Sequence, residues 1–404
     1  MYSARIVERN VAAYERANGL TLIRYDTGKV DEWAAHLNGL ATADGLFRRE
    51  LRADEKAFIR NERVLTALDF RYWFERYVRA IVDQGGLDHV TPWASQRILL
   101  DRIAKLEEEM ADQTARGEPV DGILICLHKA RQLGATLVGR ALTVHRLTTT
   151  QHTRAMAASL DDDKILELYD RDKVIIDNLP FWLRPSIGFD EKSQHIYFDK
   201  LGSRVIYQTS NQKFGVAQGR QFDLGHITEC ASWINSRTIE HDFFPTLPMS
   251  TRAMCLLEST AQRRGDWWHD FCTRCRLGKV ARFHFVFIPW YAERAKYRAA
   301  VPADWQPSDV AMLHAKKVYE TSAEFVGRAV MLEREQLYWW ERTRSSYQSG
   351  NNLNVFLTNY CATPEESFQH STRSAFATDV LDRLRLEASL KGAVMYDIAE
   401  GQAA

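Results

Sequence analysis

The sequence lacks any long uninterrupted apolar run. The longest, Ile123 to Leu127, is far shorter than the roughly 20 residues that a membrane-spanning helix needs. The first residues, MYSARIVERNVAAYERANG, carry charges where a secretory signal peptide has an apolar core. We therefore expect a cytoplasmic protein without a membrane partner.

The chain also lacks an excess of either charge. Lys plus Arg and Asp plus Glu are both 53, so the formal net charge is zero, and any contact with DNA must come from a local patch. A charged fraction of 26% and an apolar fraction of 45% are typical of globular proteins and exclude a disordered chain. The six cysteines are scattered, which excludes a disulfide scaffold and indicates reduced thiols.

Short apolar segments such as GILICL, RAMCLLEST and ARFHFVFIPW alternate with helical patterns between residues 66 and 300. This alternation predicts an α/β fold with a mostly parallel central sheet flanked by helices. The segment HIYFDKLGSRVIYQTS predicts a hairpin with Gly202 at its turn. Residues 1–65 predict an N-terminal helical extension, and residues 301–376 predict a small helical subdomain.

The segment HKARQLGAT, directly after GILICL, is a candidate phosphate-binding loop. Such a loop needs inward-pointing backbone N–H groups, a cation, and a hydroxyl for Mg²⁺. In the pattern G-x-x-x-x-G-K-[ST], Gly134 and Thr136 match, whereas Ala135 occupies the usual lysine position and Lys129 the first glycine position. A loop wrapped around a phosphate brings its two ends together, so Lys129 can replace the missing lysine, and Arg131 adds a second cation. The alternative is an ordinary strand-to-helix turn with surface cations.

The segment ILICLHKARQLGATLVG resembles the deviant Walker A motif of bacteriophage-type terminase large subunits, the ATPases that drive double-stranded DNA into procapsids. In that family the lysine often begins a K-x-R-Q-x-G-x-[ST] loop, which corresponds here to Lys129, Arg131, Gln132, Gly134 and Thr136. The resemblance implies that Lys129, Arg131, Gln132, Gly134, Ala135 and Thr136 bind the nucleotide.

The segment GRQFDLGHITECASW resembles the Walker B region of the same family. The resemblance implies that Glu229 activates the attacking water. Thr228 stands where the family usually has an aspartate, so it would hold Mg²⁺ only through its hydroxyl or a water. A solvated carboxylate after a short strand is the alternative for Glu229.

Two further segments resemble terminase motifs. CLLESTAQRRGDWW is similar to the coupling motif, in which Ser259 and Thr260 would contact the γ-phosphate or the water, unless they are only turn-forming hydroxyls. TPWASQRILL is similar to the adenine-side segment, in which Gln96 would bond the base edge, unless it is only a polar helix residue. Candidates for an arginine finger or sensor are Arg220, Arg263 and Arg264, each of which has a surface arginine as its alternative.

The resemblance, over residues 66 to 376, implies a P-loop NTPase of the additional-strand, catalytic-glutamate type, with residues 66–300 as the ATPase core. It implies ATP and Mg²⁺ as cofactors, hydrolysis coupled to translocation of double-stranded viral DNA, and transient docking on the procapsid in the host-cell cytoplasm. Expected partners are the DNA, a small terminase subunit, the portal protein and further copies in a ring. Residues 377–404 would begin a linker toward a nuclease domain, so no nuclease activity is expected from this chain.

Two other functions remain open. One is a nucleotide-binding or structural module that has lost hydrolysis, because the usual lysine and aspartate are missing. The other is a helicase-like DNA-dependent ATPase. Separately, His269, Cys272 and Cys275 have zinc-like spacing, with His284 as a fourth candidate. Because they lie in a helical pattern without a second CxxC, we expect a packed helix face instead.

Overall fold

The computed structural model describes residues 1–42, 45–81, 85–190, 195–210 and 220–368. Its centre is an eight-stranded sheet with the strand order β10-β3-β9-β8-β4-β7-β6-β5. The strands are β3 (Ile123–Lys129), β4 (Arg154–Ser159), β5 (Gly188–Asp190), β6 (His195–Phe198), β7 (Ser203–Thr209), β8 (Leu224–Thr228), β9 (Met254–Ser259) and β10 (Phe283–Ile288). A separate two-stranded sheet pairs β1 (Arg79–Ile81) with β2 (Leu87–His89).

The pairing of the central sheet confirms the predicted fold class. The six strands from β10 to β7 in the sheet order run parallel, while β6 pairs antiparallel with both β7 and β5. β9 lies between β3, which leads into the candidate phosphate loop, and β8, which ends at Thr228. One extra strand thus lies between the strands that lead into the two candidate motifs, as expected of the additional-strand type. β6 and β7 also form the predicted hairpin, with Gly202 at φ 63°.

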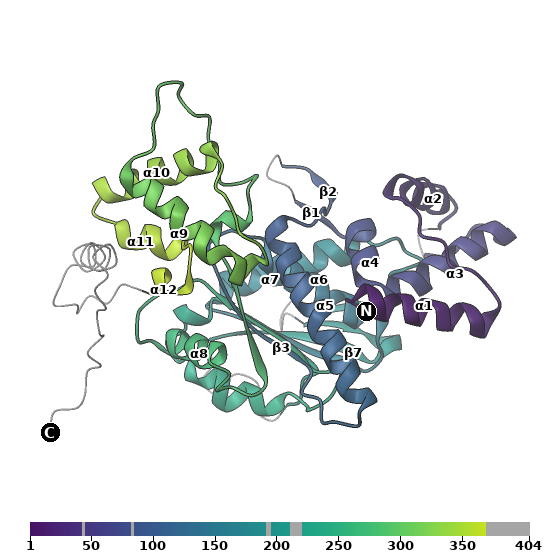
Figure 1. The fold of residues 1–404 in the computed structure, drawn as a ribbon. Helices are drawn as coiled ribbons and strands as arrows, with labels where there is room; N and C mark the ends of the chain where they lie inside the picture. Colours follow the sequence, from purple (N-terminus) through teal and green to yellow (C-terminus); the bar gives the residue numbers. More distant parts are fainter. Residues whose placement is uncertain (43–44, 82–84, 191–194, 211–219, 369–404) are drawn as a thin grey trace.

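Alternation of side chains along β3 places apolar residues on both faces of the sheet. Ile123, Ile125 and Leu127 belong to one core cluster, whereas Leu124 and Cys126 belong to a second. The helices α5 (Ala94–Ala115), α6 (Ala135–Thr149) and α7 (Asp162–Asp177) cover the first face, and α8 (Trp267–Arg276) covers the second (Figure 1). Both faces are therefore buried, which explains why the strand is largely apolar.

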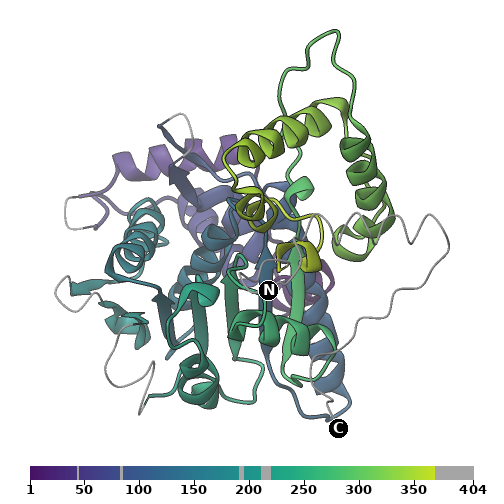
Figure 2. The same ribbon diagram turned by 90° about the vertical axis from the view of Figure 1, so that its left-hand side faces the viewer.

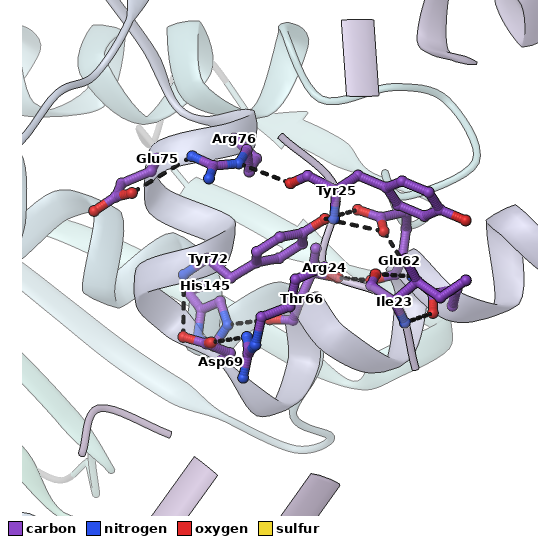
Figure 3. Close-up of polar contacts among 11 residues, drawn as sticks. Ile23, Arg24, Tyr25, Glu62, Thr66, Asp69, Tyr72, Glu75, Arg76 and His145 are labelled. Atoms are coloured by element: carbon purple, nitrogen blue, oxygen red, sulfur yellow. Dashed lines mark hydrogen bonds and ion pairs between the residues drawn. The ribbon is translucent and has the colours of Figure 1, made fainter. Parts of the chain in front are cut away.

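The N-terminal helices are α1 (Ala4–Asn18), α2 (Thr27–Gly39), α3 (Ala53–Leu68) and α4 (Phe70–Tyr77). The aromatic, amphipathic pattern of residues 70 to 82 predicts a single helix, but α4 ends at Tyr77 and β1 of the small sheet begins at Arg79. The Glu62 carboxylate is buried and accepts a hydrogen bond from the Tyr72 hydroxyl, while His145 of α6 contacts the Thr66 carbonyl (Figure 3). The Tyr77 hydroxyl also donates to Glu62. The contact of His145 with Thr66 joins the N-terminal helices to the sheet domain.

The C-terminal helices are α9 (Asp309–Val326), α10 (Arg334–Ser349), α11 (Leu353–Asn359) and α12 (Pro364–Ser367). They gather at one end of the sheet, opposite the N-terminal helices (Figures 1 and 2). Trp340 and Phe356 belong to the same core cluster as Phe58 of α3 and Val138 of α6. The extension, the core and the helical subdomain predicted from the sequence thus share one apolar interior. The proposed linker, residues 377–404, lies outside the described residues.

The described residues also form short 3-10 helices at 199–201, 230–232, 244–246 and 290–292, and a short π-helix at 239–243. Among the described helices, none combines the length and the apolar character that crossing a membrane requires.

Candidate nucleotide-binding site

The sequence-predicted site residues meet mostly at the edge of the sheet where β3, β9 and β8 end. Lys129 closes β3, Ser259 closes β9 and Thr228 closes β8. These strands are neighbours and run parallel, so their carboxyl ends lie side by side. In open α/β sheets this edge is where ligands bind.

Two left-handed residues shape the loop between β3 and α6. Gln132 has φ 56° and Gly134 has φ 71°. A Cβ atom at Gly134 would lie 2.6 Å from Nε2 of Gln96, so this position requires glycine for both its conformation and its space. Gly134 precedes the first turn of α6 and has no side chain to cap it, so the N–H groups there can bind an anion.

The start of α5 holds the loop from one side. Ser95 Oγ donates to the Leu133 carbonyl at 3.0 Å, and Gln96 Nε2 donates to the Gly134 carbonyl at 3.0 Å. Gln96 Oε1 also accepts from the Trp93 N–H at 2.9 Å. Gln96 thus positions the candidate phosphate loop; its predicted contact with adenine stays a prediction.

Segments from further along the chain hold the loop from the other side. Lys296 Nζ donates to the Gln132 carbonyl at 3.1 Å, and the Tyr297 hydroxyl donates to the Arg131 carbonyl. The Arg131 N–H donates to the Asn359 carbonyl, at the end of α11, at 2.8 Å. These contacts use the backbone of the loop, and Arg131 itself is an exposed residue. Its guanidinium is therefore available to a phosphate.

His128, the residue before Lys129, adds another contact with the helical subdomain. Its Nε2 lies 2.7 Å from the Ser367 hydroxyl of α12. Trp268 donates to Nδ1 of His128, so Nε2 carries the proton. Burial lowers the pKa of His128 to about 3, which keeps this histidine neutral. The strand that leads into the loop is thus bonded to the C-terminal helices as well.

Lys129 lies at the bottom of the loop, buried beside a carboxylate that sequence analysis did not identify. Its Nζ is 3.8 Å from Oε2 of Glu258, and Oε1 of Glu258 is 3.1 Å from Nε2 of His226. Burial alone would raise the pKa of Glu258, but Lys129, His226 and more weakly the Thr136 side chain lower it to about 2. Glu258 is therefore ionised at neutral pH, and it faces both the lysine and the hydroxyl residue of the loop.

One signal in the sequence pointed to Glu258. It is the only charged residue of MCLLES, a strand whose six residues are all buried. A carboxylate in such a strand needs a specific partner, since an unpaired buried charge is costly.

Thr228 and Glu229 lie where β8 ends. The Thr228 hydroxyl is buried and donates to Ser159 Oγ at 2.8 Å, so it already has a partner within the sheet. Glu229 is half-buried and has φ 55°, a left-handed conformation that is strained for a residue other than glycine. Glu229 interacts electrostatically with Lys164 of α7. The pKa of Lys164 is raised mainly by Glu167 and, more weakly, by the charge of Glu229. Glu229 is therefore held at the same edge as the loop by an unusual backbone turn.

The two residues of the predicted coupling motif differ in burial. Ser259 is buried and its Oγ accepts a 3.1 Å hydrogen bond from the Ala231 N–H, in the turn that follows Glu229. Thr260 is half-buried and lies just beyond β9. The structure brings Ser259 to the turn that carries Glu229; contact of either residue with a phosphate stays a prediction.

The three candidate arginines divide between opposite edges of the sheet. Arg263 and Arg264 are exposed in the turn after β9, on the same edge as the phosphate loop. Arg220 precedes β8 and lines a pocket of about 560 Å³ with Arg154 and Arg204, which lie at the starts of β4 and β7. That pocket is at the amino ends of the parallel strands, so Arg220 is not placed to sense nucleotide in its own chain. Contact with a neighbouring subunit stays a prediction for all three.

The four residues whose spacing resembles that of zinc ligands lie on two elements, α8 and β10, and the two cysteines among them are buried in the core. Cys272 and Cys275 lie on α8 and are buried, with Cys272 Sγ 3.6 Å from Cys126 Sγ of β3. His269 packs against Phe368, and Nδ1 of His284 lies 3.4 Å from Arg102. The two cysteines therefore form part of a packed helix face, as the helical pattern indicates. Within the described part of the chain, no group of three or more potential metal-binding side chains occurs.

No protein-family model and no curated protein matches this chain. Among solved structures it is similar to the large terminase of bacteriophage HK97, with 12% identity, a TM-score of 0.46, and coverage of 73% of this chain and 54% of that one. It is also similar to the large terminase ATPase domain of Thermus phage P74-26, with 12% identity, a TM-score of 0.40, and coverage of 64% and 92%. A third is the large terminase of a thermophilic bacteriophage in complex with ATP-gamma-S, with 12% identity, a TM-score of 0.31, and coverage of 52% and 48%. The chain thus spans about half the length of the HK97 protein.

Proposed function

We propose that this chain is the ATPase motor domain of a terminase large subunit, which couples ATP hydrolysis to the translocation of double-stranded viral DNA into a procapsid. One observation carries the proposal. Lys129 and Thr136 of the loop and Glu229 at the end of β8 lie at one edge of the sheet, with an extra strand between the two motif strands. This is the set of groups that phosphate binding and water activation require.

Each group has a role in hydrolysis that follows from its position. The N–H groups at the start of α6 bind phosphate oxygens, and Lys129 and Arg131 neutralise their charge. Glu229 orients the water and takes its proton, because it is half-buried and lies at the edge where the γ-phosphate would be bound. Ser259, bonded to the Ala231 N–H, transmits the change in occupancy to the turn that holds Glu229.

Oxygen ligands suited to Mg²⁺ are present beside the loop. Thr136 offers a hydroxyl and Glu258 an ionised carboxylate, which are the ligand types that Mg²⁺ prefers. When bound, the ion would neutralise phosphate charge and orient the γ-phosphate. The Thr228 hydroxyl is a poorer candidate than expected because it is directed at Ser159.

The remaining elements of the proposal concern the assembled motor. We infer double-stranded DNA, a small terminase subunit, the portal protein of the procapsid and further copies of the chain in a ring as partners, in the cytoplasm of an infected cell. Arg263 and Arg264 support a ring, since both are exposed on the edge of the sheet that carries the phosphate loop. An arginine so placed can reach a nucleotide held by a neighbour.

The test is phosphate release from ATP by the purified chain, with and without double-stranded DNA. We expect slow hydrolysis that DNA stimulates, together with saturable binding of a fluorescent ATP analogue. Binding without any hydrolysis would instead support a module that has lost catalysis. ATP-dependent separation of strands would support a helicase-like enzyme, because a packaging motor moves the intact duplex.

A further inference from the structure

The two oxygens of the Glu258 carboxylate have different surroundings. Oε1 is 3.1 Å from Nε2 of His226. Oε2 is buried and accepts no direct hydrogen bond from the described residues; its charged neighbour, Lys129 Nζ, is 3.8 Å away. This distance exceeds that of a hydrogen bond. One oxygen is therefore held in place, while the other is an acceptor without a hydrogen-bond donor beside the candidate phosphate loop.

A buried polar network orients the carboxylate from behind. Arg140 Nη1 lies 3.4 Å from Nδ1 of His226, and an arginine can only donate, so Nε2 of His226 carries the proton that faces Glu258. Arg140 is fully buried and forms an ion pair with Asp172, which also accepts from the Tyr207 hydroxyl. Supporting contacts of this kind fix the orientation of metal-binding carboxylates.

The register of the sheet places Glu258 directly beside the position that lacks an acid. Thr228 of β8 and Glu258 of β9 are paired across the two parallel strands. Paired residues of neighbouring strands point to the same face, and the strands are about 4.8 Å apart. A carboxylate at Glu258 can therefore reach nearly the same point as one at Thr228.

We propose that Glu258 supplies the carboxylate that holds the nucleotide-bound Mg²⁺, in place of the aspartate that this chain lacks at Thr228. The inference rests on the proposed function, because the ion would arrive with ATP. Thr136, at the start of α6, would supply a hydroxyl ligand.

The same arrangement explains why Lys129 and Glu258 are paired at the bottom of the loop. Both side chains are buried, and without nucleotide each serves as the other's counter-charge. When a phosphate binds, Lys129 is attracted to it, and Glu258 then needs another cation. Mg²⁺ provides that cation, so the nucleotide and its metal together replace one buried ion pair by two.

The test compares wild type with Glu258→Gln, which keeps the side-chain shape and removes the charge. Titration with a fluorescent ATP analogue is performed in Mg²⁺ and again in EDTA, and bound Mn²⁺ is counted by electron paramagnetic resonance in the presence of ADP. We expect the substitution to weaken Mn²⁺ binding by at least about tenfold, because losing a direct ligand costs no less than losing an outer-shell partner. Nucleotide affinity in EDTA should change far less, because the phosphate contacts remain.

A second variant moves the carboxylate to the neighbouring strand. Thr228→Asp combined with Glu258→Gln should recover most of the Mn²⁺ affinity, because the two positions are paired in register. The double variant also restores a counter-charge for Lys129, so it tests the inference even if Glu258→Gln alone fails to fold. Glu229→Gln is the matched control: it removes a carboxylate from the same edge and should leave Mn²⁺ affinity within a few-fold.

The outcomes separate this inference from the proposed function. If wild type binds no nucleotide with or without Mg²⁺, the proposed function is wrong. If wild type binds nucleotide and Mn²⁺, and folded Glu258→Gln binds Mn²⁺ equally well, Glu258 is not the metal ligand, although the nucleotide site stands. Failure of the folded double variant to regain Mn²⁺ affinity would also overturn the inference.

Discussion

The hydroxyl of Ser259 accepts a hydrogen bond from the backbone N–H of Ala231, which joins the end of β9 to the turn that carries Glu229. Ser259→Ala removes this acceptor and leaves the N–H without its partner, a loss of about 1–3 kcal/mol. We expect the Glu229 turn to become less ordered, so phosphate release should slow while nucleotide affinity changes little. Equal hydrolysis rates for Ser259→Ala and wild type would contradict a role for this bond. Thr260→Ala is the comparison, because Thr260 is half-buried and lies beyond the strand.

Lys129→Ala should weaken ATP binding. A charge-assisted contact with phosphate contributes roughly 1.5–3 kcal/mol, so the dissociation constant should rise about ten- to hundredfold. Titration with a fluorescent ATP analogue measures the change, and Arg131→Ala shows how much the exposed guanidinium contributes by itself. If only Arg131→Ala weakens binding, Lys129 serves solely as the counter-charge of Glu258.

Glu229→Gln should abolish most hydrolysis without preventing binding. The substitution preserves the shape of the side chain and removes its ability to accept a proton, which typically reduces the rate by about 10²–10⁴. Phosphate release under saturating ATP measures the rate, and the fluorescent analogue checks that affinity stays within a few-fold. Near wild-type turnover would assign the base to another residue.

Gly139→Ala should destabilise the protein, because the added methyl group would clash with the His226 ring. A Cβ atom at Gly139 would lie 2.4 Å from Cε1 of the buried His226 ring. Forcing an additional methyl group into such a contact costs about 1–3 kcal/mol, which urea unfolding would detect. Gly39→Ala, where a Cβ meets no atom within 4 Å, is the matched control and should be nearly neutral. Equal stability of both variants would show that the His226 ring moves freely.

The buried His145 should make the protein less stable as the pH falls below about 6.5. Burial lowers its pKa to about 3, so the folded state keeps it neutral while the unfolded state takes up a proton. The contribution reaches about 1.4 kcal/mol per pH unit below the unfolded pKa. Urea unfolding between about pH 7 and pH 5 should show a smaller loss of stability for His145→Gln than for wild type. Parallel pH profiles would mean that the pKa of His145 is the same in the folded and unfolded states.

Much of the fold was available from local sequence patterns. Short apolar segments predict β3, β8, β9 and β10, because a strand buried on both faces must be largely apolar. The strand β4 and the early end of the helix at Tyr77 were not predicted. Secondary-structure propensity is a weak signal over such short segments, and pairing with distant strands decides whether they form a strand or a helix.

The sequence by itself determined the candidate phosphate loop as a strand-to-helix turn, because its backbone conformation depends on neighbouring residues such as Gln132, Gly134 and Thr136. Only the tertiary structure decided what lies opposite the loop. It paired Glu258 with Thr228, placed Glu258 beside Lys129, and put Arg220 at the other edge of the sheet. The physical reason is that strand order and register bring together residues that are far apart in the chain, and burial then determines their charges.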